Sequence, residues 1–121
     1  MVGLGADVVH IDRFRVALQR TPSLAVRLFT ATERAYAETA RDPAERFAVR
    51  FAAKEAAMKA LGVGLGAFPF AAVALVNAEG GAPSLVLTGR AATLADERGV
   101  KDWRVSVTHD HHVAFAVVVA L

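Results

Sequence analysis

The sequence contains no cysteine among its 121 residues, which excludes disulfides, thiolate metal sites and thiol catalysis. An excess of one charge is also missing: 14 basic and 12 acidic residues leave a net charge of +2, too small to indicate nucleic acid as a partner. No apolar run reaches the roughly 18 residues of a membrane span. No basic segment precedes the apolar start of the chain, so we expect no signal peptide and a cytoplasmic location.

The composition is that of a folded protein. Hydrophobic residues make up 55% of the chain and charged residues 21%, which excludes an intrinsically disordered chain. The length of 121 residues is within the usual size of one domain, about 100–200 residues, and no linker or repeat interrupts the sequence. We therefore expect a single domain over residues 1–121.

The strongest helix signal lies in the middle of the chain. Asp42 and Pro43 are the residue types of an N-cap and a first helical position. An Ala-rich stretch without glycine or internal proline continues from there to Leu61, and Gly62 is a typical terminator. We predict one long helix between these signals.

Shorter elements surround the long helix. Thr30 and Glu33 form a capping box, which predicts a helix from Ala31 to about Ala40. Alternating apolar residues and turn residues predict strands over 2–9, 72–78, 84–88, 103–108 and 113–119, helices over 11–19 and 90–98, and a turn at 79–81. Strands and helices do not alternate as a parallel sheet requires. The expected fold class is therefore α+β, with a mostly antiparallel sheet packed on the long helix.

Two carboxylates in apolar surroundings suggest a cation site. Asp7 interrupts the first predicted strand, where a carboxylate needs a counter-charge. Phe51, Glu55 and Lys59 are spaced four apart and share one helix face, and Phe51 draws that face toward the core. With the Gly-rich loop at 62–66, these are the parts of a magnesium–phosphate site. The alternative is a weak, exposed ion pair between Glu55 and Lys59.

Several motifs follow one another along the chain. They are Gly5-x-Asp7 with Arg13 after it, Phe29-Thr30 before Glu33, Phe-x-x-Lys-Glu-Ala-x-x-Lys-Ala at 51–60 with the Gly-rich loop, Leu87-Thr88-Gly89-Arg90-Ala91, and Thr108-His109. In this order they resemble the holo-acyl-carrier-protein synthase family, the small phosphopantetheinyl transferases. The resemblance covers essentially the whole chain.

The resemblance implies a reaction, a metal ion and an assembly. Members transfer the 4′-phosphopantetheine arm of coenzyme A to a serine of an apo acyl carrier protein and release adenosine 3′,5′-bisphosphate. They require Mg²⁺ and form homotrimers whose active sites are shared between subunits. The acceptor is then a carrier protein, and those of fatty-acid and of polyketide synthesis both stay open.

The resemblance also implies roles for individual residues. Asp7 and Glu55 are expected to bind the metal and, with Lys59, to be the catalytic residues. The residues expected to contact coenzyme A are Lys54, Lys59, Gly62, Gly64, Gly66 and His109. For the base that accepts the serine proton, Glu55 itself and a water bound to the metal both stay open.

The segment after the first strand is rich in arginine. Arg13, Arg20 and Arg27 recur every seven residues, so a mostly helical segment would place them along one side. The resemblance implies that an acidic acyl carrier protein docks on these residues. A solvated helix face is the alternative.

Two other functions fit parts of the sequence. One is a non-catalytic module that binds coenzyme A or a carrier protein, although such a module does not need both Asp7 and Glu55. The other is a magnesium-dependent phosphohydrolase, which would use water in place of serine. The tract His109-Asp110-His111-His112 resembles a transition-metal site, but we predict a polar turn there because strand alternation points these side chains in different directions.

Overall fold

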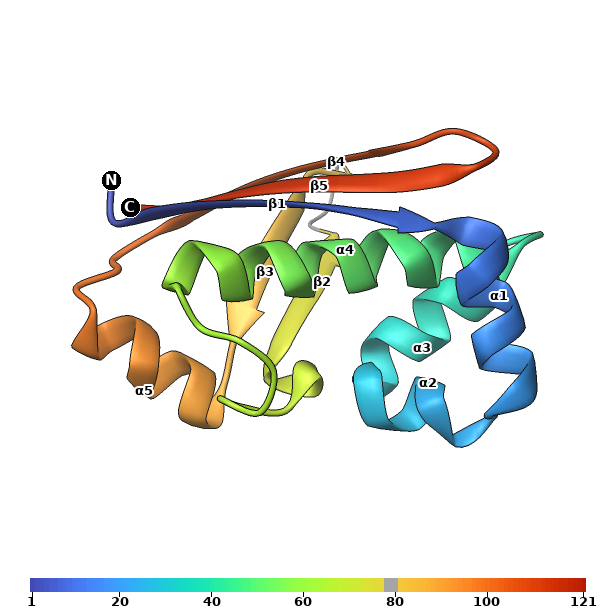
Figure 1. Cartoon of the computed structure of the whole chain (residues 1–121), viewed down its shortest axis with the longest axis horizontal. Helices are drawn as coiled ribbons and strands as arrows, with labels where there is room; N and C mark the ends of the chain where they lie inside the picture. The colour runs from blue at the N-terminus through green and yellow to red at the C-terminus, as the bar shows by residue number, and fades with distance from the viewer. Residues whose placement is uncertain (78–80) are drawn as a thin grey trace.

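The described part of this computed structural model, residues 1–77 and 81–121, folds into α-helices and antiparallel strands. The elements in chain order are β1 (Gly3–His10), α1 (Ile11–Arg20), α2 (Ser23–Leu28), α3 (Ala31–Glu38), α4 (Pro43–Leu61), the 3₁₀ helix η1 (Phe70–Ala72), β2 (Val73–Asn77), β3 (Pro83–Leu87), α5 (Gly89–Glu97), β4 (Trp103–His109) and β5 (Val113–Ala120) (Figure 1). All the predicted helices and strands are present. The last residue of the strand predicted over 72–78 and, apart from Gly81, the turn predicted at 79–81 lie outside the described residues.

The long helix α4 begins and ends where the sequence predicts. Pro43 occupies its first position, where a missing N–H is tolerated, and Gly62 ends it with a left-handed φ of 71° that disfavours any residue with a Cβ. Asp42 stands at the N-cap position but makes no capping hydrogen bond, because its carboxylate pairs with the Arg15 guanidinium. Of the 19 residues of α4, 13 are buried, so neighbouring elements cover the helix on nearly every side.

A three-stranded antiparallel sheet, in the order β1-β5-β4, covers one face of α4. Strand β1 lies unusually close to the helix because two of its residues have no side chain. A Cβ on Gly5 would lie 1.9 Å from the carbonyl oxygen of Ala56, and a Cβ on Gly3 would lie 1.8 Å from that of Ala60. Glycine at both positions therefore sets the spacing between strand and helix.

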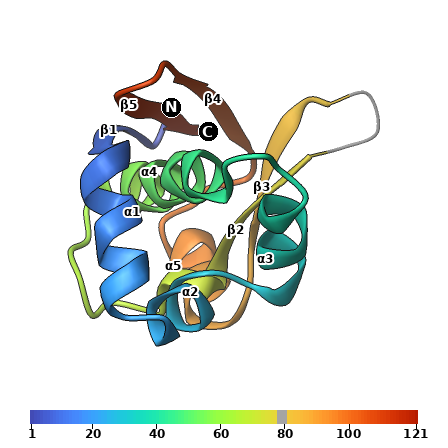
Figure 2. The same cartoon turned by 90° about the vertical axis from the view of Figure 1, so that its right-hand side faces the viewer.

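The remaining elements pack around the other sides of α4. Strands β2 and β3 form a separate antiparallel pair, helices α1 to α3 gather at the N-terminal end of α4, and α5 lies near its C-terminal end (Figures 1 and 2). The expected antiparallel pairing on one long helix is confirmed, with the described strands divided between two sheets. Helices α2 and η1 were not predicted; Pro22 separates α1 from α2 and stands directly before the first residue of α2.

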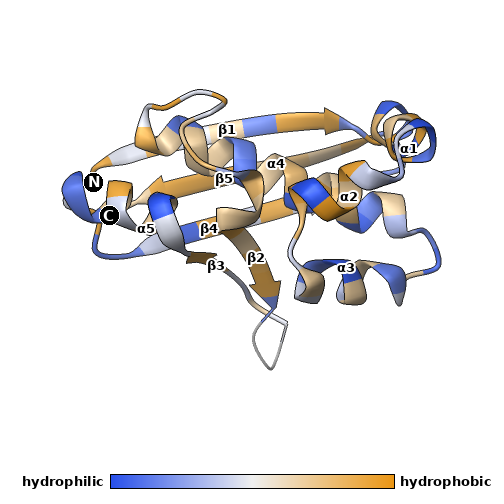
Figure 3. Ribbon diagram, turned by 90° about the horizontal axis from the view of Figure 1, so that it is seen from below, coloured by the Kyte–Doolittle hydropathy of each residue, from blue (hydrophilic) through white to orange (hydrophobic). Residues whose placement is uncertain are grey.

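Phenylalanine rings connect the helices at one end of the molecule. The ring centroids of Phe14 and Phe51 are 5.0 Å apart, those of Phe29 and Phe47 4.8 Å, and those of Phe51 and Phe70 5.4 Å. Each fully buried ring stabilises the fold by about 1.5–3 kcal/mol. Hydrophobic residues also run along β5 and much of α4 (Figure 3). Among the described residues, no helix is long and apolar enough to cross a bilayer.

Candidate active site

Strand β1 holds Asp7 on the face of the sheet that α4 covers. Its side chain is 18% exposed. Lys59, in the last turn of α4, donates hydrogen bonds to Oδ1 of Asp7 at 3.1 Å and to the carbonyl oxygen of Ala6 at 2.9 Å. The close approach of the strand at Gly5 brings Asp7 within reach of the helix. The ammonium group thus supplies the counter-charge that a carboxylate in an apolar strand requires.

Glu55 lies one turn before Lys59 on α4 and shares a pocket with Asp7. The pocket has a volume of about 360 Å³ and is also lined by Phe51 and Arg13. Partial burial raises the pKa of Glu55 above its ordinary value, and the nearby Asp7 raises it further, while Lys59 opposes the shift. Two carboxylates that repel each other therefore face the same small volume.

This pair of carboxylates fits a hard divalent cation such as Mg²⁺. Carboxylate oxygens are preferred ligands of Mg²⁺, which is usually held by one or two of them together with waters and substrate phosphates. The repulsion that raises the pKa of Glu55 is relieved when a cation lies between the two groups. Asp7 and Glu55 are thus the residues of this pocket that would hold the ion.

The glycines of 62–66 belong to a longer loop, residues 62–69, that joins the C-terminal end of α4 to η1 and begins just after Lys59; from here on this whole segment is called the Gly-rich loop. Gly62, Gly64 and Gly66 are exposed. A Cβ placed on Gly64 or Gly66 would meet no atom within 4 Å. Such an open loop lets a ligand come close to the backbone, and backbone N–H groups are good phosphate donors.

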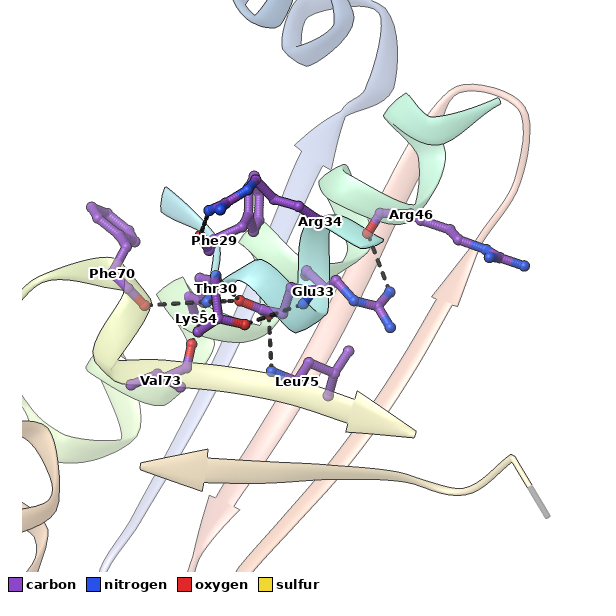
Figure 4. Close-up of polar contacts among 10 residues, drawn as sticks. Phe29, Thr30, Glu33, Arg34, Arg46, Lys54, Phe70, Val73 and Leu75 are labelled. Carbon is purple, nitrogen blue, oxygen red and sulfur yellow. Dashed lines mark hydrogen bonds and ion pairs between the residues drawn. The ribbon is translucent and has the colours of Figure 1, made fainter. Parts of the chain in front are cut away.

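Lys54, which the resemblance predicts to contact coenzyme A, is not among the residues that line the pocket of Asp7 and Glu55. Its side chain is fully buried, and Nζ donates to Oε1 of Glu33 at 2.7 Å, to the carbonyl oxygen of Phe70 at 3.2 Å and to that of Val73 (Figure 4). These contacts use all three N–H donors of an ammonium group. Neighbouring helical residues point about 100° apart, so Lys54 faces the core while Glu55 faces the pocket.

His109 lies at the opposite edge of the sheet from Asp7. It belongs to β4 and Asp7 to β1, with β5 between them. Its Nε2 atom is 3.3 Å from Oε2 of Glu45, and it lines a second cavity of about 580 Å³. Among the described residues that line this cavity, neither Asp7 nor Glu55 occurs. Within one chain, the predicted site residues therefore form two separate groups.

The cavity beside His109 contains basic side chains that the sequence motifs did not indicate. Arg46 and Arg50, both on α4, place their guanidinium groups 4.2 and 4.5 Å from the ring centroid of Tyr36, and Arg41 also lines the cavity. Three arginines beside an aromatic ring suit an anionic, planar ligand. The signal was present in the sequence, because arginines spaced four apart share a helix face.

The histidine-rich tract forms the predicted turn between β4 and β5. Oδ1 of Asp110 accepts hydrogen bonds from the backbone N–H groups of His112 at 2.7 Å and Val113 at 2.8 Å. These bonds lower the pKa of Asp110. Within the part of the chain that the structure describes, no three His, Asp or Glu side chains gather as metal ligands.

The three arginines expected to bind a carrier protein do not form one row. Arg13 and Arg20 line one groove of about 540 Å³ beside α1, together with Leu24. Arg27 belongs to α2 and is not among the residues that line this groove. The helix breaks at Pro22, so the seven-residue spacing does not continue in space. Arg13 also lines the pocket of Asp7 and Glu55, which places the groove next to that pocket.

Comparison with known proteins assigns the chain to a family. The family model described as the 4′-phosphopantetheinyl transferase superfamily matches residues 3–116. The chain belongs to this superfamily. It is 48% identical over 120 residues to the holo-acyl-carrier-protein synthase of Frankia casuarinae, which covers 99% of this chain and 97% of that protein. The resemblance inferred from the motifs is confirmed, and with it the assignment to an enzyme family.

Solved structures of the same superfamily share the fold. The holo-acyl-carrier-protein synthase of Neisseria meningitidis matches with a TM-score of 0.92 at 28% identity, covering 100% of this chain and 98% of that one. The Helicobacter pylori enzyme, solved in complex with coenzyme A, matches with a TM-score of 0.86 at 28% identity, covering 98% of this chain and 99% of that one. The predicted α+β fold of a phosphopantetheinyl transferase is therefore confirmed.

Proposed function

We propose that this protein, as a single domain, transfers the 4′-phosphopantetheine arm of coenzyme A to a serine of an apo acyl carrier protein in a Mg²⁺-dependent reaction. The proposal rests on the pocket that Asp7 and Glu55 line, together with Lys59, which donates a hydrogen bond to Asp7 from the last turn of α4 before the Gly-rich loop. The names of the relatives and the coenzyme A complex of the Helicobacter pylori enzyme support it. We place the reaction in the cytoplasm.

In this reaction the serine oxygen bonds to the phosphorus of the arm, the bond from that phosphorus to the leaving adenosine 3′,5′-bisphosphate breaks, and the serine proton passes to Glu55 or to a water molecule at the site. Residues in and next to the pocket stabilise the negative charge of the reacting phosphates. Asp7 and Glu55 would hold Mg²⁺, which neutralises charge on the pyrophosphate. Lys59 adds a positive charge beside it, and the Gly-rich loop offers backbone N–H groups. Preorganised charges of this kind stabilise a phosphoryl-transfer transition state.

The cavity beside His109 suits the nucleotide end of coenzyme A. That end carries phosphates and a planar base, and the cavity offers Arg41, Arg46 and Arg50 together with the ring of Tyr36. A coenzyme A molecule that contacts both the Asp7–Glu55 pocket and the cavity beside His109 must reach both edges of the three-stranded sheet, because Asp7 lies on β1 and His109 on β4. Head-to-tail contacts between identical subunits bring opposite edges together and close into a ring. The proposal therefore includes a homotrimer with shared active sites.

The outer face of the three-stranded sheet supports such an assembly. Leu4 is 57% exposed and Val8 54%, and both lie on the face turned away from α4 with Phe115 and Val117 of β5. None of the described elements covers this face in Figure 1. An uncovered apolar sheet face in a folded chain is typical of a subunit contact.

Substitution of Val8 by lysine is expected to convert the trimer into folded monomers with little transferase activity, because a buried charge at the contact costs several kcal/mol. Size-exclusion chromatography with light scattering measures the mass, and circular dichroism checks the fold. Val26→Lys, at an apolar position 63% exposed on α2, is the matched control and should stay trimeric. A Val8→Lys protein that keeps the wild-type mass would contradict the contact.

Charge reversal at Arg13 or Arg20 is expected to raise the KM for the carrier protein about 10-fold, and reversal at Arg20 should leave the KM for coenzyme A nearly unchanged. An acidic partner is attracted by the groove that both residues line, whereas the pocket of Asp7 and Glu55 is lined by Arg13 but not by Arg20. Steady-state kinetics with each substrate varied in turn measures the two constants. Lys101→Glu, an exposed reversal elsewhere, is the control. An Arg20 reversal that raises the KM for the carrier protein and the KM for coenzyme A equally would exclude the docking site. Among the reversals at Arg13, Arg20 and Arg27, the one at Arg27 should have the smallest effect on the KM for the carrier protein.

Intact-mass analysis of an apo acyl carrier protein tests the reaction itself. Incubation with the protein, coenzyme A and Mg²⁺ should add one phosphopantetheine arm, and EDTA should abolish the addition. Binding of coenzyme A without any addition, across several carrier proteins, would indicate the non-catalytic module. Release of free pantetheine phosphate without a carrier protein would indicate a phosphohydrolase.

A further inference from the structure

The buried ion pair between Glu33 of α3 and Lys54 of α4 stands apart from the pocket and has no part in the reaction as described. Both side chains are fully buried, and Nζ lies 2.7 Å from Oε1. Replacement of a buried ion pair by apolar groups is often neutral or even stabilising. Stability alone is therefore a weak reason for a charged pair at this place.

The other contacts of the pair lead to the segment that follows the Gly-rich loop. Lys54 donates to the carbonyl oxygens of Phe70 and Val73, and Oε2 of Glu33 accepts from the backbone N–H of Leu75 at 3.0 Å (Figure 4). The pair thus fixes η1 and the start of β2 to α4. The attachment point on α4 is the residue directly before Glu55.

A row of aromatic rings connects the same segment to the pocket. The ring of Phe70 stacks on that of Phe51, with centroids 5.4 Å apart and planes 24° apart. Phe51 lines the pocket one helical turn before Glu55 and packs on Phe14 of α1. The Gly-rich loop is consequently held at both ends by α4, at Gly62 directly and at Phe70 through Lys54 and Phe51.

We infer that Glu33 and Lys54 are positioning residues, which fix the far end of the Gly-rich loop so that the loop is preorganised to receive the pyrophosphate of coenzyme A. This inference rests on the proposed function, because it assigns the loop to coenzyme A. Neither residue touches the substrate. Their effect passes through the backbone of residues 70–75 to the loop at 62–69.

The decisive variant is Glu33→Gln combined with Lys54→Met. It removes the charge from both partners, keeps an amide oxygen for the capping contact of residue 33, and takes the donor away from Phe70 and Val73. We expect the KM for coenzyme A to rise about 10-fold, with kcat and the KM for the carrier protein within about 2-fold of wild type. Amide hydrogen exchange of residues 62–69, measured without any substrate, should become about 10-fold faster.

Two further variants separate positioning from stability. Thr30→Ala removes the hydroxyl that caps α3 at 3.2 Å from the Glu33 backbone N–H and leaves the ion pair intact. It should lower the melting temperature without changing the KM for coenzyme A. Glu33→Asp keeps the charge and shortens the reach, so it should fold even if the double variant does not, and it should raise this KM about 3-fold.

Wild-type KM and wild-type loop exchange in Glu33→Asp and in any folded double variant would overturn the inference and leave the pair a purely structural one. Failure of the wild-type protein to modify a carrier protein would instead count against the proposed function. The exchange rates of the loop would still decide whether the ion pair holds it in place. The two failures are therefore distinguishable.

Discussion

Gly5→Ala is expected to destabilise the protein by about 3 kcal/mol, which corresponds to a fall in melting temperature of roughly 10 °C or more. The added Cβ would lie 1.9 Å from the carbonyl oxygen of Ala56, so β1 and α4 must move apart. The sign of this change in the free energy of unfolding is informative, because Gly→Ala within a strand ordinarily stabilises a protein by about 0.5–1 kcal/mol. Transferase activity should fall as well, since Asp7 lies two residues further along the displaced strand. Thermal unfolding and a transferase assay measure both effects.

Gly64→Ala is the matched control for this substitution. It adds the same methyl group where no atom lies within 4 Å, so its melting temperature should stay within about 2 °C of wild type. A Gly5→Ala protein as stable as Gly64→Ala would show that β1 does not need the close approach to α4. That outcome would also remove the physical reason for glycine two residues before Asp7.

Features that depend on local sequence were predictable. The capping box is present with both of its bonds: Glu33 accepts from the Thr30 backbone N–H at 3.0 Å, and Thr30 accepts from that of Glu33 at 3.2 Å. The shared face of Glu55 and Lys59 likewise follows from a spacing of four residues. Such patterns need only the geometry of one helix, and the structure contains them as expected.

Features that depend on distant contacts were not predictable in the same way. Glu33 serves as a cap and also binds Lys54, 21 residues later, and the backbone of Leu75, 42 residues later. No local spacing indicates these partners. Lys54 is predicted to contact coenzyme A because its motif places it beside Glu55, whereas the helix turns the two side chains toward different neighbours.

The position of His109 depends on the order of strands in the sheet. The motifs place it in the same family site as Asp7, yet the order β1-β5-β4 puts the two residues on opposite edges of one chain. A sequence pattern lists residues of a site without stating which chain supplies them. Because one chain holds Asp7 and His109 on opposite edges of its sheet, a site that contains both residues needs a second chain. This is the physical reason for the proposed head-to-tail assembly.

Glu55→Gln is expected to lower kcat/KM on the order of 10³-fold while the protein stays folded. The substitution removes one of the two carboxylates proposed to hold Mg²⁺, and loss of one preorganised electrostatic group typically costs 10²–10³-fold. Intact-mass kinetics at saturating Mg²⁺ measures the loss. Glu38→Gln, an exposed change on α3, is the control and should leave the rate unchanged.

The same substitution is expected to raise the melting temperature of the metal-free protein at pH 7. The pKa of Glu55 is raised in the folded state by burial and by Asp7, so the ionised carboxylate opposes folding. A raised folded-state pKa adds stability below the unfolded pKa, and this stability disappears as the pH rises through the folded value. The increase in melting temperature of Glu55→Gln over wild type should accordingly be largest near pH 7 and vanish below about pH 4. An inactive variant less stable than wild type at pH 7 would mean that Glu55 supports the fold, and its loss of activity would then say nothing about a metal ligand.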